Sequence, residues 1–389
     1  MVSIHDWDKR VSYAMRRLDS SIVSESNKKL IKDFVNYSLA SGISKARIER
    51  YITVLRQFGL QISKGFKELD KSDFIRLIGL LESSNYKLWT KVTYKTVLRK
   101  FVTWLYDVEE APACVKWIDV SSKNVKRLPE EILTQEEVKQ LIEGAKYERD
   151  KALISVLYES GCRVGELGNL LIRHVQFDKH GAILHVDGKT GQRRVRIITS
   201  ATYLAEWLNK HPDRRPDNYL WVSLPPNDGR LVNYSSIRRL ISVVAKKAGI
   251  AKRVNPHSFR HARATHLSNH LTEAQMKEYL GWTQDSSMAS VYIHLSGRDV
   301  DNALLRINGI SVEEESKNDS FKPVECSRCN YSNKPTDKYC SKCGLILDVK
   351  EAIEMEKVNQ DKDKLLNLLI NDPEVKKLLI EKARMMNNG

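Results

Sequence analysis

The chain has 389 residues, of which 41% are hydrophobic, so it can form two or three domains with at least one sizeable core. This composition excludes a disordered protein. No run of about 18 apolar residues occurs, and we therefore expect no membrane-spanning helix. The N-terminal residues are charged throughout and lack the apolar stretch of a secretory signal, so we expect a cytoplasmic protein.

The formal net charge is +15, and it is unevenly distributed. Residues 1–130 hold 24 Lys and Arg against 15 Asp and Glu, and residues 131–310 hold 26 against 19. Residues 311–389 hold 14 against 15. The surplus in the first two segments favours an anionic polymer such as double-stranded DNA as the partner, although solubility alone would also account for it.

Residues 1–23 form an N-terminal segment, and amphipathic helices are predicted over residues 24–110. The apolar stripes recur at helical spacing, while lysines and arginines occupy many of the other positions. The pattern predicts a small helical domain whose basic surface suits an anionic partner such as DNA; with the resemblance described below, residues 24–110 are expected to be the DNA-binding domain. Residues 111–130 are polar, contain two prolines and show no clear period, so they indicate a linker.

A second domain is predicted over residues 131–310. Thr134 followed by Glu137 is a capping-box pattern and marks the first helix. A helical stretch follows and is interrupted near residues 160–166. Three short strand patterns come next, and helices dominate again to about residue 306. The sequence therefore predicts a mainly α, multidomain protein whose second domain is an α+β unit with a small sheet.

The segment NPHSFRHARATHL, residues 255–267, combines apolar side chains with three histidines and two arginines. On a helix, His257, Arg260, His261 and Ala264 share one stripe. A guanidinium group suits a phosphate because it gives two parallel charge-assisted bonds, and an imidazole adds a donor or proton carrier. The structural alternative is that Arg260 pairs with a carboxylate and His257 caps the helix.

Three other segments offer related chemistry. Arg163 and Glu166 lie one helical turn apart, so the carboxylate can hold the arginine while leaving donors for a ligand. Lys189 lies in a predicted hairpin turn, where it could equally be an ordinary exposed lysine. Trp282 and Tyr292 lie in a helical pattern that could equally bury the tyrosine in a core.

The ordered set of these residues resembles the tyrosine recombinase/integrase family over roughly residues 20–310. The family pattern is an arginine with a nearby acid, a hairpin lysine, a His-x-x-Arg motif, a His or Trp after Leu-Gly, and a tyrosine about ten residues later. Here these positions are Arg163, Glu166, Lys189, His257, Arg260, Trp282 and Tyr292.

The resemblance implies a site-specific recombinase or integrase that cuts and rejoins DNA through a 3′-phosphotyrosyl intermediate. It makes Tyr292 the nucleophile, Lys189 the general acid on the departing 5′-oxygen, and His257 a proton carrier or phosphate ligand. The donors to the phosphate oxygens would be Arg163, Arg260 and Trp282. Neither ATP nor a catalytic metal is required, and four protomers are expected to assemble on two duplexes.

Residues 321–348 form a separate module with two Cys-x-x-Cys pairs. This spacing suits a structural Zn²⁺ ion held by four thiolates, as in a zinc ribbon. Residues 350–389 predict a helical tail. The ribbon could bind DNA or mediate protein contacts with the tail, and the near-zero net charge of residues 311–389 favours protein contacts. The four cysteines are Cys326, Cys329, Cys340 and Cys343.

Two alternatives share these motifs. A DNA-binding regulator on a degenerate recombinase fold is disfavoured because all the catalytic residue types are present. A type IB topoisomerase uses the same tyrosine chemistry, but the separate N-terminal helices and the HSFRHARATHL segment favour a recombinase.

Overall fold

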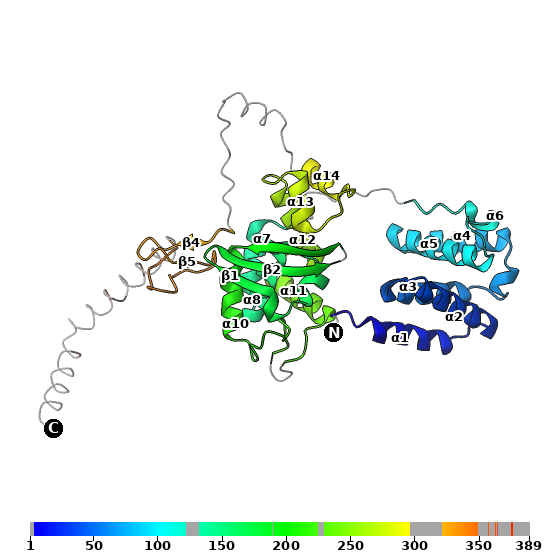
Figure 1. Ribbon diagram of the computed structural model, residues 1–389, viewed down its shortest axis with the longest axis horizontal. Helices are drawn as coiled ribbons and strands as arrows, with labels where there is room; N and C mark the ends of the chain where they lie inside the picture. Colours follow the sequence, from blue (N-terminus) through cyan, green and yellow to red (C-terminus); the bar gives the residue numbers. More distant parts are fainter. Residues whose placement is uncertain are drawn as a thin grey trace, which may run out of the picture. The chain divides into compact units, whose positions relative to one another are not determined.

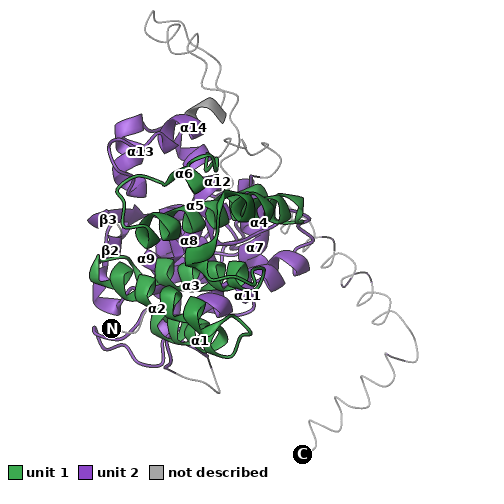
Figure 2. Cartoon of the chain, turned by 90° about the vertical axis from the view of Figure 1, so that its right-hand side faces the viewer, with its two compact units in different colours: residues 1–127 green, residues 128–389 purple. Residues whose placement is uncertain are grey.

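The computed structural model describes residues 4–121, 132–188, 190–224, 229–295 and 321–348, together with a few isolated residues beyond them. The chain divides into two compact units, residues 1–127 and residues 128–389, which Figure 2 distinguishes by colour. Of the predicted linker, residues 111–130, residues 122–130 lie outside the described residues, as do the segment 296–310 and all but four residues of the tail 350–389. Residues 111–121 belong instead to the first unit, where Val115 and Ile118 are buried in the core.

The first unit is helical. Its core consists of the apolar stripes that the sequence predicted, with Ile31, Phe34, Phe101 and many other side chains fully buried. Leu39, near the end of the second helix, is 44% exposed and lies outside this core. The elements are α1 (Trp7–Asp19), α2 (Glu25–Ala40), α3 (Lys45–Gly59), the 3₁₀ turn Phe66–Glu68, α4 (Lys71–Ser83), α5 (Leu88–Leu105) and α6 (Ala113–Lys116).

The N-terminal segment belongs to this unit. Residues 1–23 contain α1, which the sequence analysis did not predict as a helix, and its Ala14 and Leu18 join the common core. Asp70 caps α4, where its carboxylate accepts hydrogen bonds from the backbone N–H groups of Ser72 and Asp73. Burial of its apolar stripe therefore holds α1 in the bundle. The side-chain cap at Asp70 determines where α4 begins.

The second unit is built around α8 (Glu148–Ser160), whose residues 152–160 are all buried. Figure 1 shows this helix beside the sheet, and it contacts α7, α10, α12 and β3. The remaining helices are α7 (Gln135–Gly144), α9 (Val164–Gly168), α10 (Thr199–Asn209), α11 (Tyr234–Lys247), α12 (Pro256–Leu267), α13 (Glu273–Leu280) and α14 (Met288–Leu295).

Local signals set the ends of these helices. Thr134 and Glu137 form the predicted capping box of α7. The helix α8 ends at Gly161, which adopts a positive φ of 57°. A Cβ at Gly161 would lie 2.7 Å from Leu280, so glycine is required there by both backbone and packing. The chain turns sharply at this point and places Arg163 at the start of α9.

The small sheet has the order β1-β2-β3 and is antiparallel. Its strands are β1 (Val175–Asp178), β2 (Gly181–Gly188) and β3 (Gly191–Ile197). Gly188 pairs with Gly191, so the connection consists of two residues, as the predicted turn requires. Lys189, one of these two, lies outside the described residues.

The predicted mainly α fold with small sheets is confirmed. The cysteine module contains the short strands β4 (Val324–Glu325) and β5 (Ser332–Asn333), which pair with each other. Among the described residues, no helix is both long and apolar enough to cross a membrane.

Candidate active site and metal centre

Arg163 and Glu166 lie together at the start of α9. The Arg163 guanidinium donates from Nη1 to Glu166 Oε1 at 2.7 Å, and the Arg163 backbone N–H donates to Glu166 Oε2 at 2.9 Å. Glu166 is buried, whereas about a third of the Arg163 side chain is exposed. The carboxylate therefore fixes the arginine while part of its guanidinium still faces solvent.

Arg193 on β3 is a second cation on the same carboxylate. Its Nη2 donates to Glu166 Oε2 at 2.7 Å, and its Nε donates to the Tyr279 carbonyl at 3.1 Å. Burial raises the pKa of Glu166, but the hydrogen bond and charge of Arg193, followed by Arg163, outweigh it and lower the pKa below its ordinary value. Glu166 is therefore ionised and bridges two arginines.

Arg260 lies on α12 and is 7% exposed. It pairs with no carboxylate in the described residues, because Nη1 donates to the Gly161 carbonyl at 2.8 Å and Nη2 donates to the Leu280 carbonyl at 2.6 Å. Burial, followed by the charge of Arg163, lowers its pKa to about 10. The group remains a cation at neutral pH, in surroundings that favour a nearby anion.

The backbone around Gly281 joins these elements. The Gly281 carbonyl accepts from Arg163 Nη2 at 3.1 Å and from Thr190 Oγ1 at 3.3 Å. Thr190 is the neighbour of Lys189, so the hairpin that carries the lysine ends beside Arg163. Gly281 has a φ of 62°, and a Cβ there would lie 2.7 Å from Arg193 Nη1. A side chain at this position would therefore displace the Arg193 guanidinium.

Trp282 connects Arg260 to Tyr292. Its ring lies 5.4 Å from the Arg260 guanidinium carbon and stacks on the Tyr292 ring, with centroids 5.6 Å apart and planes 8° apart. Tyr292 on α14 is 4% exposed. Its hydroxyl shares a hydrogen bond with Nδ1 of His261, the residue that follows Arg260.

His257 lies in the first turn of α12 and is exposed. Asn255, and not His257, caps this helix, with its side chain accepting from the His257 backbone N–H at 2.9 Å. The structure thus gathers Arg163, Glu166, Arg260, Trp282 and Tyr292, and it places His257 on the same helix as Arg260.

Sequence reasoning missed Arg193 and gave no role to His261. Arg193 pairs in register with Val186, which is buried, and shares its strand face with buried Val195. The period of two along β3 therefore carried a signal that this arginine points inwards. Nothing local indicates the partner of His261, because Tyr292 lies 31 residues away.

The four predicted cysteines form one cluster. Their sulfur atoms all lie within 4.8 Å of one another, with 3.5 Å between Cys326 and Cys343 and 3.6 Å between Cys329 and Cys340. Burial raises the pKa of Cys340, but backbone N–H groups of Cys343 and Lys342 outweigh it and lower the pKa to about 6. The cluster can hold a metal ion.

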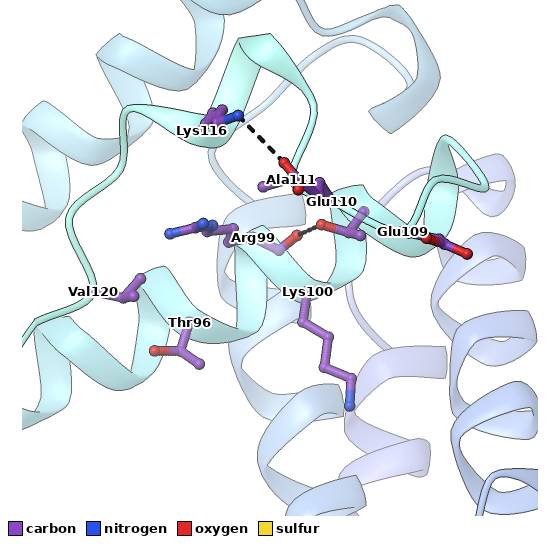
Figure 3. Close-up of a pocket in the computed structure, with 9 residues that line it drawn as sticks. Thr96, Arg99, Lys100, Glu109, Glu110, Ala111, Lys116 and Val120 are labelled. Carbon is purple, nitrogen blue, oxygen red and sulfur yellow. Dashed lines mark hydrogen bonds and ion pairs between the residues drawn. The ribbon is translucent and has the colours of Figure 1, made fainter.

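A cavity of about 440 Å³ on the first unit is a different kind of site. Its lining includes Arg99, Lys100 and Lys116 together with Glu109 and Glu110. In Figure 3, Lys116 faces Glu110, and these two form an ion pair at 3.3 Å, whereas Lys100 extends away from them. The lining mixes three basic with two acidic side chains, and no nucleophile with an adjacent base lines the cavity.

Residues 131–298 match the model of the phage integrase family. Over 283 residues the chain is 27% identical to tyrosine recombinase XerA of Pyrococcus furiosus, covering 72% of this chain and 94% of the relative. It is 28% identical over 295 residues to tyrosine recombinase XerC of Bacillus subtilis, covering 70% and 93% of the two chains.

Two solved structures share the fold. One is the XerH site-specific recombinase bound to a palindromic difH substrate, with a TM-score of 0.55, 18% identity and coverage of 78% of this chain and 95% of that one. The other is a lambda integrase dimer bound to a COC′ core site, with a TM-score of 0.56, 13% identity and coverage of 70% and 78%. The domain match and these relatives support the tyrosine recombinase family for this chain, and with it a tyrosine-type site-specific recombinase.

Proposed function

We propose that this site-specific recombinase cuts and rejoins double-stranded DNA through a 3′-phosphotyrosyl link to Tyr292. The phenolic oxygen attacks the scissile phosphorus, the bond from phosphorus to the 5′-oxygen breaks, and Lys189 gives that oxygen a proton. The link conserves the energy of the broken bond, so the reverse attack by a 5′-hydroxyl reseals the strand. The reaction needs neither ATP nor a catalytic metal.

The arrangement around Gly281 carries this proposal. Arg163 and Arg260 are held by a buried carboxylate and by backbone carbonyls, so their positions are fixed before a phosphate arrives. Fixed cations stabilise the charge that develops on the non-bridging oxygens of the attacked phosphorus. The Trp282 indole lies against Arg260 and adds an N–H donor, and His257 on the same helix serves as a phosphate ligand or proton carrier.

The contact between Tyr292 and His261 represents a resting pose of the nucleophile. The hydroxyl is engaged with an imidazole and the ring is 4% exposed, so the tyrosine has to turn towards the phosphate before attack. A free tyrosine has a pKa of about 10 and is scarcely ionised at neutral pH. The cations and the imidazole next to it supply the activation that the phenol needs.

Changing Tyr292 to Phe tests the proposal directly. The variant keeps the ring and its stacking on Trp282 but lacks the attacking oxygen, so it should bind a nicked suicide substrate and form no covalent adduct. Denaturing gels of labelled DNA measure the adduct, and a mobility shift measures binding. Covalent attachment by the Phe variant would refute the assignment of the nucleophile.

We further propose that the cysteine cluster holds one structural Zn²⁺ ion. Four thiolates close a tetrahedral site and leave no open position for catalysis. Hydrogen bonds from backbone N–H groups to Cys340 and Cys326 favour the thiolate form that the metal needs. The positive charge of residues 1–310 serves the DNA, and the family likeness implies that four protomers assemble on two duplexes.

A further inference from the structure

Within the second unit, the cysteine module packs against α8 and α10, and α8 also contacts α12, the helix that carries Arg260. We infer that the ribbon, residues 321–348, is an intramolecular clasp whose partner is the α8–α10 face of its own chain, and that bound metal keeps it in place. The inference rests on the proposed zinc site, and it assigns the module a role in stabilising the catalytic unit.

The first contact lies where the ribbon begins. Phe321 is 5% exposed and meets the Tyr158 ring of α8 edge-on, with centroids 4.9 Å apart and planes at 83°. Its carbonyl accepts a hydrogen bond from Thr199 Oγ1, at the first residue of α10, at 3.0 Å. An apolar anchor and a polar contact together fix the entry of the chain into the ribbon.

A second set of contacts lies farther along α10. Tyr203 is 1% exposed, and its hydroxyl is 2.7 Å from Thr336 Oγ1. Lys334 forms an ion pair with Glu206, and its ammonium lies 5.3 Å from the Tyr203 ring centroid. Because Thr199, Tyr203 and Glu206 share one face of α10, the ribbon covers this helix over about two turns.

The ribbon surface that makes these contacts depends on the fold around the cysteines. Asn333 is 1% exposed and joins the two halves of the module, since its Oδ1 accepts from the Ser341 backbone N–H at 3.0 Å. Lys334 and Thr336 lie between the two Cys-x-x-Cys pairs. So short a module has little core of its own, so losing the metal should disorder this surface and release α10.

The contact also reaches the site. Tyr158, which packs on Phe321, hydrogen-bonds through its hydroxyl to His266 of α12. Arg260 lies on the same helix. Phe321, Tyr158 and His266 thus connect the ribbon, α8 and α12 through direct side-chain contacts. Removing the ribbon would leave one side of the Tyr158 ring without its packing partner.

Hydrogen exchange of the full-length, zinc-loaded chain tests the clasp. Phe321→Ala keeps all four cysteines and should retain one zinc ion per chain, yet amides in residues 199–209 should exchange at least about tenfold faster. Lys334→Met should give a smaller change in the same peptide. Tyr331→Ala is the matched control, because this ribbon aromatic is 43% exposed and should leave exchange unchanged.

Removing zinc from the wild-type chain with a chelator should reproduce the effect of Phe321→Ala. Equal exchange of residues 199–209 in the wild type and in Phe321→Ala would overturn the clasp, and unchanged exchange after verified zinc loss would overturn its dependence on metal. Hydrogen exchange in the presence of DNA tests the alternative that the ribbon binds DNA. If DNA protects the ribbon and residues 199–209 become more exposed, the ribbon is a DNA-binding arm and the clasp is refuted. Adduct formation on a suicide substrate is measured separately, so failure of the clasp and failure of the recombinase proposal remain distinguishable.

Discussion

Single residues around Glu166 decide whether the arginine site is formed before DNA arrives. Glu166 accepts from both Arg163 and Arg193, and all but about a tenth of the Arg193 side chain is buried. Arg193 Nη1 is buried and has no hydrogen-bond partner among the described residues. A buried, incompletely satisfied cation is retained because it holds the carboxylate that in turn orients Arg163.

Replacing Arg193 with Met should therefore weaken both stability and cleavage. Loss of one partner leaves the buried Glu166 charge less compensated, and we expect unfolding to become easier by about 3 kcal/mol. Denaturant titration measures this change, and a suicide substrate measures cleavage. Arg194→Met is the matched control, since Arg194 is exposed on the same strand. Equal effects of the two substitutions would contradict the positioning role of Arg193.

The ionisation of Glu166 predicts a pH dependence of stability. Its pKa is lowered in the folded chain, so its contribution is present above the ordinary carboxyl pKa and is lost as pH falls through the lower, folded value. The melting temperature of Glu166→Gln should lie below that of the wild type at pH 7, and the gap should narrow below about pH 4. A gap that stays constant over this range would mean that the carboxylate is not the stabilising species.

At the scale of elements, the turn at Gly281 fixes the distance between the hairpin and the arginines. Gly281→Ala introduces a side chain at a positive φ and against Arg193, whereas Gly249 has a similar φ of 69° with no atom within 4 Å of the added Cβ. Gly249→Ala should cost about 1 kcal/mol of stability from the backbone alone. Gly281→Ala should cost a further 1–3 kcal/mol, roughly, and reduce adduct formation. Similar losses in both variants would show that the contact with Arg193 is unimportant.

The sequence predicted most elements because their apolar periods match their burial, as in α5, and because Thr134 and Glu137 form the expected capping box of α7. It missed α1 as a helix, whose small apolar face is buried only by packing against the neighbouring helices. It also named residues that lie close together in the candidate site, namely Arg163, Glu166, Arg260, Trp282 and Tyr292. The contacts between Tyr292 and His261, and between Arg193 and Glu166, could not be predicted because they join positions 31 and 27 residues apart. Such pairings depend on the tertiary fold and leave no local pattern.

At the scale of the whole molecule, positive charge is concentrated in one part of the chain and the ribbon lies in another. The excess positive charge belongs to residues 1–310, where it can neutralise DNA phosphates, while residues 311–389 carry 14 basic against 15 acidic side chains. The ribbon uses Lys334 for its own catalytic unit, in the pair with Glu206. A module that packs on its own chain does not depend on DNA for its position.

The salt dependence of DNA binding follows from this division. The logarithm of the binding constant should fall steeply with the logarithm of salt concentration, because each neutralised phosphate releases a counterion. Arg328 and Lys342 are exposed cations of the ribbon, and changing both to Ser should leave the slope unchanged. Fluorescence anisotropy of labelled duplex over a salt series measures the slope. Each lost phosphate contact would reduce the steepness of the slope by about one. A clearly shallower slope for the double variant would therefore place the ribbon on the DNA and not on α10.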